Sequence, residues 1–166
     1  MNSSIQVRPA IPGDLPLIHQ LIRELAVYEK LEADCTGTLE QLRATLFGPS
    51  PFAKVLLAFA DERPAGAAIY FFSYSTFAAR PLLYLEDLFV RPELRGRGVG
   101  KKLFLELERI ARAQGCARME WSVLDWNQTA LDFYDRLGAR PQKAWVKYSL
   151  PLGPNRADSA GAPLPP

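Results

Sequence analysis

A glycine-rich turn is the part of this sequence best suited to binding a charged ligand. Residues 95–102 read Arg-Gly-Arg-Gly-Val-Gly-Lys-Lys. Alternate glycines let the backbone turn sharply and bring its N–H groups close to a ligand. A helix that begins in this turn adds its positive N-terminal end, which favours an anion and suits a pyrophosphate best. Charge around the anion would come from Arg95, Arg97, Lys101 and Lys102.

Two common nucleotide-binding motifs do not fit the letters of this turn. A P-loop ending at Gly100-Lys101 would need Gly at position 95 and Ser or Thr at position 102, which are Arg95 and Lys102. A dinucleotide fingerprint beginning at Gly96 would need a third Gly at Lys101. The turn instead has the pattern Arg95-x-x-Gly98-x-Gly100. The remaining alternative is a tight turn whose charges are only solvated.

A pair of adjacent carboxylates precedes the turn. Glu86 and Asp87 interrupt the otherwise apolar segment Tyr84–Val90. Burying charge in such a strand is costly without a purpose, so we expect a role in chemistry or in binding a cation. In a regular strand the two side chains would point to opposite faces. The alternative for each is a charge at a strand end in solvent.

The elements that must position these residues follow from the apolar pattern and the turn residues. Asp14 can cap the first helix, and Thr38 with Gln41 forms a capping box for the second. We expect an α/β fold, a mixed central sheet with helices on both faces, in the order β-α-α-β-β-β-α-β-α-β. The strands are expected at residues 6–9, 53–60, 65–74, 82–90, 117–124 and 145–150, and the helices at 14–28, 38–47, 98–114 and 129–137. Residues 1–150 are expected to form one domain, and the Pro/Ala/Gly-rich residues 151–166 a disordered tail.

Composition narrows the class of protein. The chain has 166 residues, of which 48% are hydrophobic and 23% charged, with a net charge of +2. This suits one globular domain and argues against a nucleic-acid partner. Cys35 and Cys116 lack metal-site spacing, and His19 is the only histidine, so we expect idle thiols, no metal and no histidine-based triad. We see neither a signal peptide nor a membrane-spanning stretch, and expect a cytoplasmic protein with no membrane partner.

Segments on both sides of the glycine turn resemble the GNAT superfamily of N-acetyltransferases, in its spermidine/spermine and thialysine branch. The resemblance covers about Val7 to Trp145, and Ser75-Thr76 with residues 124–128 are closer to the thialysine type. The segments that carry it are Arg8-Pro9-Ala10, residues 21–26, Tyr28-Glu29, residues 48–52, Tyr84–Val90, residues 123–128, Phe133-Tyr134 and Leu137-Gly138-Ala139.

This sequence departs from the branch at two positions. Gln20 stands where the relatives carry an arginine, and Lys143 stands where they carry an acidic residue. An acidic residue there can hold the far ammonium of a long polyamine. Its absence argues against spermidine or spermine as the acceptor.

The resemblance implies acetyl-CoA as the donor, a small amine as the acceptor, direct attack in a ternary complex, and a homodimer. Glu86 is implied as the base, through a water and with a raised pKa or a relay, and Tyr134 as the acid or as a hydrogen-bond donor to the leaving sulfur. The implied cofactor contacts are Leu88, Phe89, Val90, Arg95, Gly96, Arg97, Gly98, Val99, Gly100, Lys101, Asn127, Gln128, Thr129, Ala130 and Tyr134. The implied acceptor contacts are Tyr28, Glu29, Glu86, Asp87, Glu120, Trp121 and Ser122.

Two other functions stay open at this point. The chain would be a protein N-terminal or lysine acetyltransferase if its acceptor site were an open groove. It would be a non-catalytic acetyl-CoA-binding module if Glu86 or Tyr134 were missing, but both residues are present.

Overall fold

A computed structural model describes residues 4–152, which fall into two compact units, residues 4–122 and residues 123–152. The first unit is built on a five-stranded sheet in the order β1-β2-β3-β4-β5. Strands β1 to β4 form an antiparallel meander, and β5 pairs parallel with β4, so the predicted mixed sheet is confirmed. The strands are β1 (Ile5–Pro9), β2 (Lys54–Ala60), β3 (Arg63–Ser75), β4 (Arg80–Val90) and β5 (Met119–Trp121).

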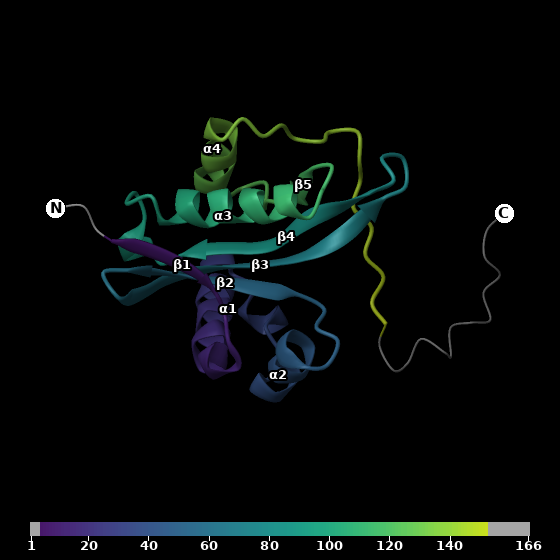
Figure 1. The fold of residues 1–166 in the computed structure, drawn as a ribbon. Helices are drawn as coiled ribbons and strands as arrows, with labels where there is room; N and C mark the ends of the chain where they lie inside the picture. The colour runs from purple at the N-terminus through teal and green to yellow at the C-terminus, as the bar shows by residue number, and fades with distance from the viewer. Residues whose placement is uncertain (1–3, 153–166) are drawn as a thin grey trace. The chain divides into compact units, whose positions relative to one another are not determined.

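Helices cover both faces of this sheet, as the sequence predicted. Figure 1 shows α1 (Leu15–Glu29) and α2 (Leu39–Phe47) on one face and α3 (Val99–Ala113) on the other. Short 3-10 turns lie between the elements: η1 (Pro12–Asp14) between β1 and α1, η2 (Glu32–Asp34) between α1 and α2, and η3 (Pro92–Leu94) between β4 and α3. The core on the α1 face consists of Ile18, Leu21 and Leu25 packed with Val55, Leu57, Ala67, Ile69 and Phe89. Burying one such large side chain stabilises the fold by roughly 1.5–3 kcal/mol.

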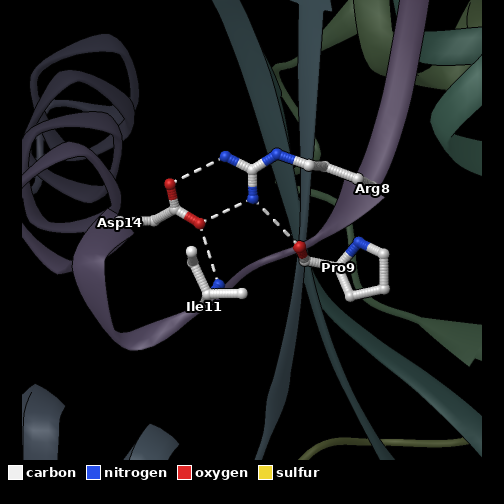
Figure 2. Close-up of polar contacts among 4 residues, drawn as sticks. All are labelled: Arg8, Pro9, Ile11 and Asp14. Carbon is white, nitrogen blue, oxygen red and sulfur yellow. Dashed lines mark hydrogen bonds and ion pairs between the residues drawn. The ribbon is translucent and has the colours of Figure 1, made fainter.

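Hydrogen bonds of Asp14 and of Thr38 with Gln41 mark the starts of α1 and α2 in different ways. Thr38 and Gln41 form the predicted capping box at the start of α2. Asp14 stands at the N-cap of α1, but its carboxylate does not cap that helix. It accepts two hydrogen bonds from the Arg8 guanidinium, at 2.7 and 2.8 Å, and one from the Ile11 N–H at 2.8 Å (Figure 2). Asp14 therefore ties β1 to the start of α1, and the Arg8 hydrogen bonds lower its pKa.

The second unit contains one helix, α4 (Gln128–Arg136). The predicted strand at residues 145–150 is wrong, because these residues adopt neither helix nor strand. Their side chains are suited to a strand, but that preference acts only where a partner strand is paired. Trp145 and Tyr148 are 78% and 90% exposed. Most of the predicted disordered tail, residues 153–166, lies outside the described residues.

Candidate functional site

The glycine turn has the backbone geometry of an anion site. Gly96 and Gly98 have φ angles of 75° and 91°, in the left-handed region that other residues rarely adopt. Gly98 is the N-cap of α3 and has no side chain to cap it. The first bond of the helix runs from the Lys102 N–H to the Gly98 carbonyl at 3.0 Å. By helix geometry, the N–H groups of residues 99–101 therefore have no intrahelical acceptor and can donate to a ligand.

The four cations of the turn are placed differently. Arg95 donates from Nε to the Val90 carbonyl at 2.9 Å, which fixes it against the end of β4. Lys102 donates to the Ile5 carbonyl of β1. Lys101 is exposed on the first turn of α3. Arg97 lines a cavity of about 490 Å³ together with Ala60, Asp61, Arg63, Glu93 and Leu94.

A β-bulge sets the geometry of the adjacent carboxylates. Ile69 of β3 pairs with Asp87 of β4, but the next residue, Tyr70, pairs with Leu85, so Glu86 is the extra residue of the bulge. The prediction that Glu86 and Asp87 point to opposite faces is wrong, because a bulge breaks the alternation of a strand. Glu86 alternates with Leu85, and Asp87 pairs with Ile69, which belongs to the core beneath α1. Both carboxylates therefore lie on the face that α1 covers.

Glu29, at the end of α1, joins Glu86 and Asp87 in a cluster that we call the carboxylate cluster. Burial raises the pKa of Asp87 to about 6, and the charges of Glu86 and Glu29 add to this shift. Burial also raises the pKa of Glu29. Within residues 4–152 none of the three carboxylates forms an ion pair. The cluster therefore has uncompensated negative charge in a partly buried place, which favours a cationic ligand.

The predicted second edge of the acceptor site divides between the two faces of the sheet. Glu120 pairs with Tyr84, and the Ser122 hydroxyl lies 3.1 Å from the Tyr84 hydroxyl, so Glu120 and Ser122 share the face of the carboxylate cluster. Trp121 pairs instead with Leu85. Its ring packs edge-to-face on Phe104 of α3, with centroids 5.4 Å apart.

The end of β4 has an open edge beside the carboxylate cluster. Only residues 83–85 of β4 pair with β5, so residues 86–90 have no partner on that side within residues 4–122. Leu88, Phe89 and Val90, which the family resemblance implies as cofactor contacts, lie in this stretch. Backbone groups on such an edge are available to a ligand.

The remaining predicted cofactor contacts lie in the second unit. The Asn127 side-chain oxygen accepts a hydrogen bond from the Ala130 N–H at 3.2 Å and so caps α4. Gln128 and Thr129 form the first turn of that helix, and the Gln128 amide donates to Asp132 at 2.6 Å. Tyr134 is near the C-terminal end of α4, with its ring 5.2 Å from that of Phe133.

Sequence reasoning missed two features of this region. Tyr84 packs on Phe71, with ring centroids 5.1 Å apart, on the face of the carboxylate cluster. Glu24 on α1 binds Arg91, just before the glycine turn, through two contacts of 2.8 and 2.9 Å. No local pattern signals the second contact, because Glu24 and Arg91 are 67 positions apart in the chain.

No helix within residues 4–152 is long and apolar enough to cross a membrane. In the same part of the chain, no group of three or more His, Cys, Asp or Glu residues is arranged to hold a metal ion.

Comparison with known proteins gives matches along most of the chain. Residues 20–139 match the family model described as "Acetyltransferase (GNAT) family". A thialysine N-epsilon-acetyltransferase of Bos taurus is 42% identical over 82% of this chain and 84% of its own length. An L-ornithine N5-acetyltransferase of Arabidopsis thaliana is 29% identical over 84% of this chain and 81% of its own. An integron cassette protein from the mobile metagenome of V. cholerae has a similar structure, with a TM-score of 0.77, 26% identity, and coverage of 96% of this chain and 99% of that one.

Proposed function

The chain belongs to the acetyltransferase (GNAT) family, and we propose that it acetylates the primary amine of a small, lysine-like acceptor such as a basic amino acid or a diamine. The observation that carries this proposal is the carboxylate cluster of Glu29, Glu86 and Asp87, which has no cationic partner in the described part of the chain. Burial, with the charges of Glu86 and Glu29, raises the pKa of Asp87, and a bound ammonium group would oppose that shift by favouring the carboxylate.

The named substrates of the relatives support this acceptor class. Thialysine and ornithine appear in the names of the relatives from Bos taurus and Arabidopsis thaliana, and both are amino acids with a terminal primary amine. By the family resemblance, Lys143 stands where the relatives carry an acidic residue, which could hold the far ammonium of a polyamine. We therefore place spermine below lysine-like amines in preference.

Acetyl-CoA is the donor we propose, and it would supply the thioester carbonyl that the amine attacks. The glycine turn fits its pyrophosphate, because the N–H groups at the start of α3 are uncapped and basic residues surround them. The proposed cofactor residues are Leu88, Phe89, Val90, Arg95, Gly96, Arg97, Gly98, Val99, Gly100, Lys101, Asn127, Gln128, Thr129, Ala130 and Tyr134.

Proton removal is the chemical task of the carboxylate cluster. A lysine-like amine has a pKa of about 10.4, so well under one per cent is reactive at neutral pH. Glu86 is exposed at the bulge, where water can reach it, and we assign it to accept the proton through a water. Asp87 and Glu29 hold the ammonium before the proton leaves. Tyr134 is assigned to hydrogen-bond the departing sulfur or to protonate it.

A thiol-release assay with a panel of acceptors tests this proposal. Lysine, thialysine, ornithine and short diamines are expected to exceed spermine in kcat/KM by roughly tenfold or more, because spermine brings further ammonium groups whose unpaired charge is costly to bury. Acceptor peptides with a free N-terminus or an internal lysine should react poorly. If spermine has the highest kcat/KM of the panel, the proposal of a lysine-like acceptor is wrong. If a peptide has the highest kcat/KM, the protein acetyltransferase alternative is favoured. Binding of acetyl-CoA without turnover of any amine would favour a binding module.

A homodimer and a cytoplasmic location also stay predictions from the family resemblance and the sequence. Light scattering at micromolar concentration is expected to give twice the mass of the chain. A monomer at that concentration would contradict the dimer.

A further inference from the structure

Two rows of residues face one another where α1 meets the start of the glycine turn. Gln20, Glu24 and Tyr28 are spaced four apart and so lie on one side of α1. Arg91 and Arg95, also four apart, flank η3. Each arginine contacts one member of the helix row: Arg91 binds Glu24, and the Arg95 guanidinium carbon lies 4.3 Å from the centre of the Tyr28 ring.

The first of these contacts holds the backbone before the turn. Arg91 donates from Nε and Nη2 to Glu24 at 2.9 and 2.8 Å, and from Nη1 to the Pro64 carbonyl at 3.0 Å. Its N–H donates to the Ala65 carbonyl at 2.9 Å. The Gln20 amide also donates a hydrogen bond to the Glu24 carboxylate at 2.8 Å. The segment that enters the turn is therefore fixed to both α1 and β3.

The second contact fixes the orientation of Arg95. Its Nε donates to the Val90 carbonyl at 2.9 Å, and its guanidinium carbon lies over the Tyr28 ring. Neither Nη group of Arg95 has a hydrogen-bond partner within residues 4–152, so both are available to an anion. A guanidinium held at Nε and on one face loses less rotational freedom when it binds a phosphate than a solvated one does.

We propose that Tyr28 is a positioning residue for acetyl-CoA binding, in addition to its predicted contact with the acceptor. Its ring holds the Arg95 guanidinium ready for the pyrophosphate, and so links the end of α1 that carries Glu29 to the glycine turn. This inference rests on the proposed function, because the anion is the pyrophosphate of acetyl-CoA.

The test is the Kd of CoA, measured by calorimetry without any amine. Tyr28→Leu removes the ring and is expected to weaken CoA binding about three- to tenfold, as the loss of a partly exposed cation–π contact implies. Tyr28→Phe keeps the ring and is expected to bind CoA within about twofold of the wild type. Arg95→Lys keeps the charge but loses the planar group, and should weaken binding as much as Tyr28→Leu does. Because the two changes remove one contact, the double variant should be no weaker than the single variants.

A matched control comes from a second guanidinium over a ring in the same unit. The Arg8 guanidinium lies 5.0 Å from the centre of the Phe59 ring, and neither residue belongs to the glycine turn. Phe59→Leu should therefore leave the Kd of CoA unchanged.

Three results would overturn the inference. A wild-type Kd for CoA in folded Tyr28→Leu would show that Tyr28 serves the acceptor alone. If Tyr28→Leu does not fold, a wild-type Kd in Arg95→Lys would have the same meaning. Failure of the wild-type protein to bind CoA at all would instead remove the proposed function, and the inference with it.

Discussion

The glycine turn and the carboxylate cluster are both charged, but they are built in opposite ways. The turn presents backbone N–H groups, and its fixed cations Arg95 and Lys102 each donate to a carbonyl. The cluster presents Glu29, Glu86 and Asp87, which have no ion-pair partner in residues 4–152. The turn is continuous in sequence, whereas the cluster joins the end of α1 to a bulge in β4.

This difference predicts how each region responds to a mutation. The anion site needs a particular backbone conformation and little else, so it should fail when that conformation is lost. The carboxylate cluster is electrostatically unfavourable without a ligand, since burial and two neighbouring charges oppose ionisation of Asp87. Removing a charge there should stabilise the protein while it harms the use of the amine.

The largest effect is expected at Gly98. Gly98→Val should weaken acetyl-CoA binding by roughly a hundredfold or more, because a β-branched residue cannot easily hold a φ of 91°. Space is not the reason, since a Cβ there would meet only the Ile5 side chain, at 3.9 Å. Calorimetry with acetyl-CoA measures the change.

Gly115→Val is the matched control for backbone strain. Gly115 also has a positive φ, of 67°, and it follows α3 at the opposite end from the turn. This variant should lose stability but keep its affinity for acetyl-CoA. Unchanged affinity in Gly98→Val, or equal losses in both variants, would refute the assignment of the anion site.

An intermediate effect is expected at Asp87. The folded-state pKa of about 6 is above the usual 3.8, so the wild type loses stability as pH rises through this range. Asp87→Asn should therefore have a higher free energy of unfolding than the wild type at pH 8, by about 1–3 kcal/mol. The gain should shrink below pH 6 and vanish near pH 4. Calorimetric scans across this pH range measure the difference in stability. A variant less stable than the wild type at pH 8 would contradict the unfavourable burial of Asp87.

The smallest effect is expected at Glu24, a carboxylate that has a partner. The hydrogen bonds from Arg91 lower its pKa, so its contribution is present above pH 4.5 and is lost as pH falls through the lowered pKa. Glu24→Gln should cost about 0.5–1 kcal/mol at pH 7, a modest value because both side chains are partly exposed. The pH dependence thus has the opposite sign to that at Asp87.

The exposed pair of Glu108 with Arg112 is the control for Glu24. Glu108→Gln should change the free energy of unfolding by less than about 0.5 kcal/mol. Equal losses at Glu24 and Glu108 would mean that the Arg91 contact does not hold α1 to the sheet.

Features encoded by nearby residues were predictable from the sequence. The Thr38 and Gln41 capping box and the Gly98 start of α3 each need only a few consecutive residues. Features that need a partner far along the chain were not. The bulge at Glu86 exists only through pairing with Ile69 and Tyr70, so strict alternation gave the wrong faces.

The same reason explains the other misses. The contact between Glu24 and Arg91 joins residues 67 positions apart. The strand expected at residues 145–150 had suitable side chains, but a strand forms only with a paired neighbour. Patterns within one segment cannot supply either kind of partner.

The central claim is that the carboxylate cluster serves the amine and its proton while the glycine turn serves acetyl-CoA. The most direct test is the pH–rate profile of Glu86→Gln with one good amine, beside Tyr134→Phe. Glu86→Gln should reduce kcat/KM by roughly a hundredfold or more at pH 7 and recover in part by pH 9, where solution supplies more free amine. Tyr134→Phe should show no such recovery, and both variants should still bind acetyl-CoA. A Glu86→Gln profile parallel to that of the wild type, or a loss of acetyl-CoA binding in that variant, would contradict the claim.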